Sequence, residues 1–290
     1  MVHIPVLLNE VIAALDPESD ENFVDCTFGW GGHSLAILKK TAPAGKILGI
    51  ERDAQSLVEI PEMIKKNPRL IIVNGSYDNI AAIARENNFD NVSGVLMDLG
   101  MSSWQLDASK KGFSFSKDEP LDMRYDQSQE LTAAAIINDF GAKEIEDIFK
   151  NYGQERFAKK IARAIEKERR RYRVETSGQL AALVKSLTPP PQRIKSLARI
   201  FQALRIAVND EIQIVRRGAV AAFEIIRPGG RMAAISFHSL EDKIIKEEFA
   251  RLVKSGRAEY IVKKPITARE DEIAANPRAR SAKLRAIVKL

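Results

Sequence analysis

The sequence has little of the residue types that build disulfides, metal sites or membrane spans. It contains a single cysteine, Cys26, and only three histidines. One cysteine excludes an internal disulfide and favours a reducing compartment, so we expect a cytoplasmic protein with Cys26 as a small core residue. Without a Cys/His cluster, no metal site is expected. No apolar run approaches about 18 residues, and the early acidic residue Glu10 follows no basic stretch, so neither a membrane span nor a secretory signal is predicted.

The remaining composition is that of an ordinary globular protein with a basic balance. Hydrophobic residues make up 45% of the 290 residues, which allows one large domain with a smaller companion. The net charge of +6 and the pI near 9.3 suit a polyanionic partner.

The stretch Asn22 to Ser34 holds the strongest local signal. Two apolar residues are followed by Asp25, which is typical of a buried strand at its carboxyl end, and the glycines at 29, 31 and 32 precede a helical pattern. A strand, a glycine turn and a helix let the backbone approach a ligand closely. A second strand ends on Glu51, at the spacing of a carboxylate that accepts ribose hydroxyls. The pattern predicts a nucleoside-cofactor site, and the alternative is a tight turn alone.

The spacing of the glycine turn bears on which cofactor is bound. Asp25 to Gly32 reads D-x-T-x-G-x-G-G, which differs from the G-x-G-x-x-G of dinucleotide binders. An acid at the strand end repels a pyrophosphate but attracts a cation. S-adenosylmethionine carries an ammonium and a sulfonium, so it is favoured over NAD.

Strand and helix patterns alternate along the first hundred residues and return near the end, which predicts a doubly wound parallel sheet. We expect a helix over 54–66, a long helix after the TPPPQ segment that continues through Ile212 and Val215, and an RPGG turn that ends it before a fifth strand. Between the fourth and fifth strands the sequence pattern is typical of a loop and then of helices. The predicted boundaries are 1–105 and 199–290 for the α/β domain, with an inserted helical, substrate-binding domain over 106–198.

Two segments are strongly basic. Residues 150–173 hold ten Lys or Arg against three Glu, and NPRARSAKLR at 276–285 has four basic residues and no acid. Such runs are usually solvated faces, and contact with nucleic acid is the second interpretation.

Eight motifs in order carry a family resemblance: HIPVLLNEV, VDCTFGWGGHS, DLGMSSWQLD, KGFSF, PLDMR, FQALRIAVNDE, SFHSLEDK and NPRARSAKLR. Together they resemble the MraW family of small-subunit rRNA methyltransferases over nearly the whole chain. The resemblance implies a class I methyltransferase, with a Rossmann-like doubly wound sheet and an inserted all-helical domain. It implies S-adenosylmethionine as cofactor and methylation of the exocyclic N4 of a cytidine in the decoding region of 16S rRNA. The cofactor-binding residues it implies are Gly31, Gly32, His33, Glu51, Tyr77, Asp98 and Gln105.

The sequence departs from the family at five of its usual residues. Glu51 replaces Asp, Tyr77 replaces Phe, Trp104 replaces Pro, Lys111 replaces Arg, and Trp30 replaces Gly or Arg. A longer carboxylate still reaches a ribose diol, and Tyr keeps an aromatic face. Trp104 and Lys111 lie in the loop assigned to the substrate side.

The chemistry of methyl transfer to an amine predicts a catalytic residue at the end of the fourth strand. The N4 lone pair of cytosine is delocalised into the ring, so the amine needs in-line placement and an acceptor that frees the lone pair. Where amino-methyltransferases generally carry D/N-P-P-Y/F, this chain has Asp98-Leu99-Gly100, so Asp98 is the candidate catalytic residue. A paired base hides its N4, so the target must be unpaired and stacked on an aromatic. The candidates for that stacking are Trp104, Phe113 and Phe115.

His238 invites two interpretations of equal weight. It is either a functional residue or part of a helix start that is capped by Ser239, with Asp242 three residues further on.

Other functions stay open at this point. One is an NAD-dependent oxidoreductase on a similar sheet, and another is a non-catalytic RNA-binding or assembly protein with a vestigial pocket. A methyltransferase with a different DNA or RNA target is a third. The expected partner is small-subunit rRNA or the 30S particle, with no membrane, and the expected state is a monomer or weak dimer.

Overall fold

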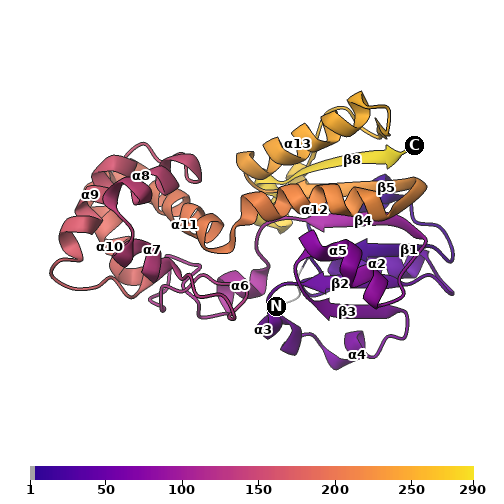
Figure 1. Ribbon diagram of the computed structural model, residues 1–290, viewed down its shortest axis with the longest axis horizontal. Helices are drawn as coiled ribbons and strands as arrows, with labels where there is room; N and C mark the ends of the chain where they lie inside the picture. Colours follow the sequence, from indigo (N-terminus) through magenta and orange to yellow (C-terminus); the bar gives the residue numbers. More distant parts are fainter. Residues whose placement is uncertain (1–3) are drawn as a thin grey trace. The chain divides into compact units, whose positions relative to one another are not determined.

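The computed structural model describes residues 4–290 and divides the chain into two compact units (Figure 1). The first unit runs to Gly100 and resumes at Ile212–Leu290, and the second, helical unit is Met101–Glu211. The boundaries predicted from the sequence are 105/106 and 198/199. The latter would cut through helix α11 (Arg193–Asn209), whose Leu197, Ile200 and Leu204 lie in the core of the helical unit.

The first unit is built on one mixed sheet with the order β3-β2-β1-β4-β5-β8-β6, in which β7 also pairs with β8. Strands β1 to β5 are parallel, whereas β8 is antiparallel to β5, β6 and β7. The strands are β1 (Asn22–Asp25), β2 (Ile47–Glu51), β3 (Leu70–Asn74), β4 (Val92–Asp98), β5 (Ile226–Ser236), β6 (Ala258–Tyr260), β7 (Ile266–Thr267) and β8 (Lys283–Lys289).

Helices cover both faces of this sheet (Figure 1). Successive strand residues point to opposite faces, so Phe23 of β1 joins one apolar cluster and Val24 joins the other. The first cluster includes residues of α1 (Leu8–Leu15) and α2 (Gly32–Lys40). The second includes residues of α5 (Ile80–Glu86), α12 (Glu211–Ile225) and α13 (Ser239–Lys254), together with the buried Cys26 that the sequence analysis placed in the core. The shorter elements are α3 (Ala54–Val58), α4 (Glu62–Lys65), α14 (Glu270–Ala275) and the 3-10 turns η1 (Tyr77–Asn79) and η3 (Pro277–Ser281).

The helical unit has a core of its own, inserted between β4 and β5 in the chain. Its elements are α6 (Ser103–Asp107), α7 (Ala133–Asp139), α8 (Ala142–Asn151), α9 (Ala158–Glu168), α10 (Ser177–Leu187), η2 (Pro190–Gln192) and α11. The helices α8, α9, α10 and α11 each contribute fully buried residues to one apolar cluster, among them Phe149, Ile161, Leu180 and Leu204. Each helix therefore turns an apolar face to this core. No helix within residues 4–290 combines the length and apolarity needed to cross a bilayer.

Three predicted elements were wrong in their extent. The long helix after TPPPQ is two helices, because Asp210 adopts a left-handed φ of 48° and ends α11. The helix expected over 54–66 is α3 and α4, which are separated around Pro61. The RPGG segment lies inside β5 and does not precede it.

Candidate active site

The glycine turn between β1 and α2 leaves no room for side chains. Gly31 has a φ of 73°, and a Cβ built there would lie 2.6 Å from the Phe28 ring. A Cβ at Gly32 would lie 2.5 Å from the Pro5 ring. The backbone at the start of α2 is therefore bare, as a site that binds its ligand by close approach requires.

Glu51 ends β2 and turns its buried carboxylate toward this glycine turn. Its Oε2 accepts a hydrogen bond from Gly29 N at 3.0 Å, and its Oε1 accepts one from Asp53 N at 2.8 Å. Each oxygen keeps a further lone pair for a ligand hydroxyl. Burial, with smaller contributions from the charges of Asp53 and Asp25, raises the pKa of Glu51 to about 7.

Asp98 ends β4 beside two other ionisable groups. Its Oδ2 lies 3.6 Å from Nδ1 of His33, and Nε2 of His33 donates to the Val6 carbonyl at 2.9 Å. The pKa of Asp98 is raised to about 6, mainly by burial; His33 opposes this rise, and the neighbouring Asp25 and Glu241 contribute to it. The strand ends therefore carry several buried carboxyls whose ionisation a cationic ligand would favour.

Three buried polar atoms at these strand ends have no hydrogen-bond partner within the described part of the chain: Trp30 Nε1, Ser76 Oγ and Asp98 Oδ1. Trp30 and Ser76 follow β1 and β3, and Asp98 ends β4; the three atoms are an indole donor, a hydroxyl and a carboxylate acceptor. Buried polar groups are nearly always paired, so these atoms fit a site that binds a polar ligand. Neither Trp30 nor Ser76 is among the site residues predicted from the sequence, although both lie beside glycines after strands, and that position is the signal that could have identified them.

The whole chain matches the MraW methylase family, over residues 1–290. The chain belongs to this family. A relative from Symbiobacterium thermophilum, named ribosomal RNA small subunit methyltransferase H, is 40% identical and aligns over 99% of this chain and 96% of its own length. A relative of the same name from Syntrophotalea carbinolica is 44% identical, over 99% of this chain and 98% of its own. With this membership, the strand order and the helical insertion identify the first unit as a class I methyltransferase fold.

Of the seven cofactor residues implied by the MraW resemblance, six lie in the first unit. Tyr77, on η1, has its ring against Gly218 of α12, where a Cβ would come within 2.3 Å of ring carbon Cδ2. Gln105 lies in the helical unit, where it caps α6: its Oε1 accepts from Ser102 N at 3.0 Å. Ser102 Oγ in turn accepts from Gln105 N at 3.2 Å, which completes a capping box.

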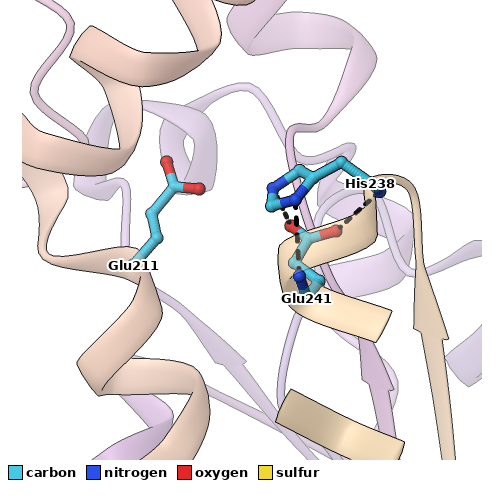
Figure 2. A group of neighbouring side chains, drawn as sticks. All are labelled: Glu211, His238 and Glu241. Atoms are coloured by element: carbon cyan, nitrogen blue, oxygen red, sulfur yellow. Dashed lines mark hydrogen bonds and ion pairs between the residues drawn. The ribbon is translucent and has the colours of Figure 1, made fainter. Parts of the chain in front are cut away.

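His238 is the N-cap of α13, one residue before the predicted cap at Ser239, which was wrong. Its Nδ1 accepts from Glu241 N at 3.4 Å, and its Nε2 lies 3.1 Å from Glu241 Oε1. Figure 2 shows this imidazole beside the Glu241 carboxylate, whose Oε2 accepts from Phe237 N at 2.9 Å. The predicted N3 partner, Asp242, pairs instead with Lys283 and Arg285. This motif is therefore a capping box built on a histidine.

Two of the three aromatic residues proposed to stack on the target base pack inside the helical unit. Phe113 is buried and stacks on Tyr125 at a centroid distance of 5.4 Å. Phe115 meets Phe201 edge-on at 5.6 Å. Trp104 is half-buried, with Lys111 Nζ 6.0 Å from its ring centroid, and it is the member of the three with the least core character.

The raised pKa values of Glu51 and Asp98 predict a pH-dependent affinity for S-adenosylmethionine. A cation binds the ionised carboxyls best, so binding should release protons and strengthen as pH rises through the free-state pKa values of about 6 and about 7. Coupling to a carboxyl of pKa about 7, such as Glu51, gives a gain of roughly tenfold between about pH 6 and pH 8. Calorimetric titrations in two buffers of different ionisation heat measure both effects. Equal affinity at all pH values, without proton release, would contradict the assignment.

Proposed function

We propose that this chain transfers a methyl group from S-adenosylmethionine to the exocyclic N4 of a cytidine in the decoding region of small-subunit rRNA. The full-length match to the MraW methylase family is the observation that carries the proposal. The buried carboxyls and bare glycine turn of the first unit support it, because they suit a nucleoside ligand that bears positive charge.

The residues proposed to hold the cofactor are Gly31, Gly32, His33, Glu51, Tyr77, Asp98 and Gln105. Glu51 accepts the ribose hydroxyls with the lone pairs that Gly29 and Asp53 leave available. The unpaired Trp30 Nε1 and Ser76 Oγ supply further donors for the ligand. When bound, the cofactor supplies a methyl group made electrophilic by its sulfonium.

Asp98 has the proposed catalytic role. Its Oδ1 is buried without a partner among the described residues, so it can accept a hydrogen bond from the N4 amino group. That bond orients the amine and frees its lone pair for attack on the methyl carbon. The carboxylate then takes up the proton that the amine loses. With a pKa of about 6, Asp98 is ionised at neutral pH and able to do so.

Mass spectrometry of small-subunit rRNA from cells with and without this protein tests the reaction directly. We expect N4-methylcytidine in the decoding region to disappear without the protein and to return with the wild-type chain, but not with an Asp98→Asn chain expressed at the same level. An unchanged nucleoside profile would overturn the proposal. Particle association with no methylation would favour a non-catalytic binding or assembly role.

The proposed partner is rRNA or the 30S particle, bound by a chain that is a monomer or weak dimer, and the exposed cations of the helical unit are candidates to contact phosphates. Arg170, Arg171 and the 54%-exposed Tyr172 follow α9 on the surface. Arg169 differs from its neighbours, because it is half-buried and donates to the Ile137 carbonyl at 2.9 Å. A test of RNA contact should therefore leave Arg169 unchanged.

We expect the double variant Arg170→Glu and Arg171→Glu to flatten the salt dependence of RNA binding. Each phosphate contact contributes about 0.7 to the slope of log K against log salt for single strands, so losing two contacts reduces it by roughly 1.4. Filter-binding or fluorescence titrations over a salt series measure the slope. The matched control reverses the exposed pair Lys39 and Lys40 at the end of α2. Equal slopes in the wild type and the first variant would identify the run as a solvated face.

A further inference from the structure

A pocket of the first unit lies where β5 passes into α13. It has a volume of about 270 Å³. Its polar lining is made of His238, Ser239, Thr267, Arg280, Ser281 and Lys283. None of these is a residue assigned to S-adenosylmethionine. A ligand bound in this pocket would therefore be distinct from the cofactor.

The charges around this pocket leave an excess of positive charge. Within residues 4–290 the exposed Arg280 guanidinium forms no ion pair. Lys283 Nζ lies 3.2 Å from Asp242 Oδ2, and Arg285 Nε lies 2.8 Å from Asp242 Oδ1, so two cations share one carboxylate. The Glu241 carboxylate is already engaged by its own backbone donors and by His238. The pocket therefore favours an anion.

The hydroxyl groups of the lining narrow the class of anion. Ser239, Thr267 and Ser281 are all exposed and come from three separate elements: the first turn of α13, strand β7 and turn η3. Hydroxyl donors combined with an arginine and a lysine are the set that proteins present to phosphate oxygens.

The pocket is also next to the proposed catalytic residue. Strand β5 pairs with β4, with Ile235 beside Asp98 in register, and Leu99 N donates to the Ile235 carbonyl at 2.9 Å. Phe237 and His238 therefore continue from the strand adjacent to Asp98. A group held in the pocket lies one strand away from the site of methyl transfer.

We propose that this pocket binds a backbone phosphate of the RNA strand that carries the target base. The inference rests on the proposed function, because it assumes that the target base lies at Asp98. The anion in the pocket is then a phosphate close to that base in the same RNA strand. When the RNA is held at that phosphate, its position relative to Asp98 is fixed. Cations elsewhere on the surface attract the RNA but do not fix which base reaches Asp98.

The first experiment tests the pocket without RNA or methyl transfer. Inorganic phosphate is titrated into the full-length protein at constant ionic strength, and the backbone amide NMR shifts of Ser239 and Ser281 are followed. We expect saturable shifts in the wild type and in Arg278→Ala, which removes an exposed arginine of the same turn that does not line the pocket. Arg280→Ala should weaken phosphate binding roughly tenfold, the scale of a lost charge-assisted hydrogen bond. Shifts that do not saturate, or equal losses in both variants, would overturn the site.

The second experiment connects the pocket to the strand. With 30S particles as substrate, Arg280→Ala should raise KM about tenfold and leave the affinity for S-adenosylhomocysteine unchanged, and Arg278→Ala should change KM much less. If KM rises equally in both variants, the pocket has no role beyond general electrostatics and the inference falls. If phosphate binds as expected but the wild type methylates no cytidine, the anion site stands and the proposed function fails.

Discussion

Replacing Asp98 by Asn should lower the rate of methyl transfer to small-subunit particles by about 10²-fold at saturating S-adenosylmethionine, the usual scale of a positioned acid–base group. The amide keeps the shape of the side chain and one acceptor oxygen. It loses the charge and the capacity to take up the proton of the N4 amine. The pKa of Asp98 is about 6 without ligand, and the bound cation lowers it, so the saturated wild-type rate should fall only at a pH below that value.

The measurement separates the two roles assigned to Asp98. Single-turnover rates at saturating cofactor report on the amine, and calorimetric affinity reports on the cofactor. Asp90→Asn is the matched control, because Asp90 is an exposed carboxylate just before the opposite end of β4. A full saturated rate with weakened affinity would restrict Asp98 to cofactor binding. A full rate with full affinity would remove it from the site and leave the Trp104 loop as the next candidate.

The core of the site could be predicted because its signals are local. A strand that stops at Asp25, glycines that tolerate φ values such as the 73° of Gly31, and an acid at the end of the next strand all lie within about thirty residues. Parallel strands bring their carboxyl ends to one edge of the sheet. The order of elements alone therefore predicts that Asp25, Glu51 and Asp98 lie at one edge of the sheet.

Helix boundaries could not be predicted where the apolar period continues through a break. Leu204, Val208, Ile212 and Val215 keep helical spacing, although Asp210 between them is left-handed and the chain passes from one unit to the other. Periodicity reports which face is buried but is insensitive to one residue of unusual φ. The antiparallel direction of β8 could not be predicted either, because a run of apolar residues does not indicate parallel or antiparallel pairing.

The sequence could not predict which buried polar side chains have hydrogen-bond partners inside the protein. Whether Trp30 Nε1 and Ser76 Oγ are paired depends on atoms that are distant in the chain, and the structure shows no partner for either atom within residues 4–290. The capping boxes that Gln105 makes at α6 and His238 makes at α13 also appear only in the structure. Gln105 stays a proposed cofactor residue. A cap and a ligand contact call for the same residue types, so a motif alone cannot separate them.

Replacing Glu51 by Ala should weaken S-adenosylhomocysteine binding tenfold or more. The change leaves the ribose hydroxyls of the ligand without an acceptor, and a buried unpaired donor costs about 1–3 kcal/mol. It also removes the acceptor of Gly29 N and Asp53 N, so the glycine turn loses one of its contacts with β2. Glu51→Gln separates these effects: it keeps one acceptor and abolishes the charge, so it should flatten the pH dependence of affinity that a carboxyl of pKa about 7 produces.

The control for Glu51 is Glu59→Ala, which removes an exposed carboxylate from the end of α3. Thermal unfolding without ligand checks that each variant is folded before its affinity is compared. Calorimetric titration with S-adenosylhomocysteine then gives the result. We expect Glu59→Ala to match the wild type. If folded Glu51→Ala also matched it, the carboxylate would serve the turn alone, and the ribose hydroxyls would have to be held by other groups, for which the unpaired Ser76 Oγ is the next candidate.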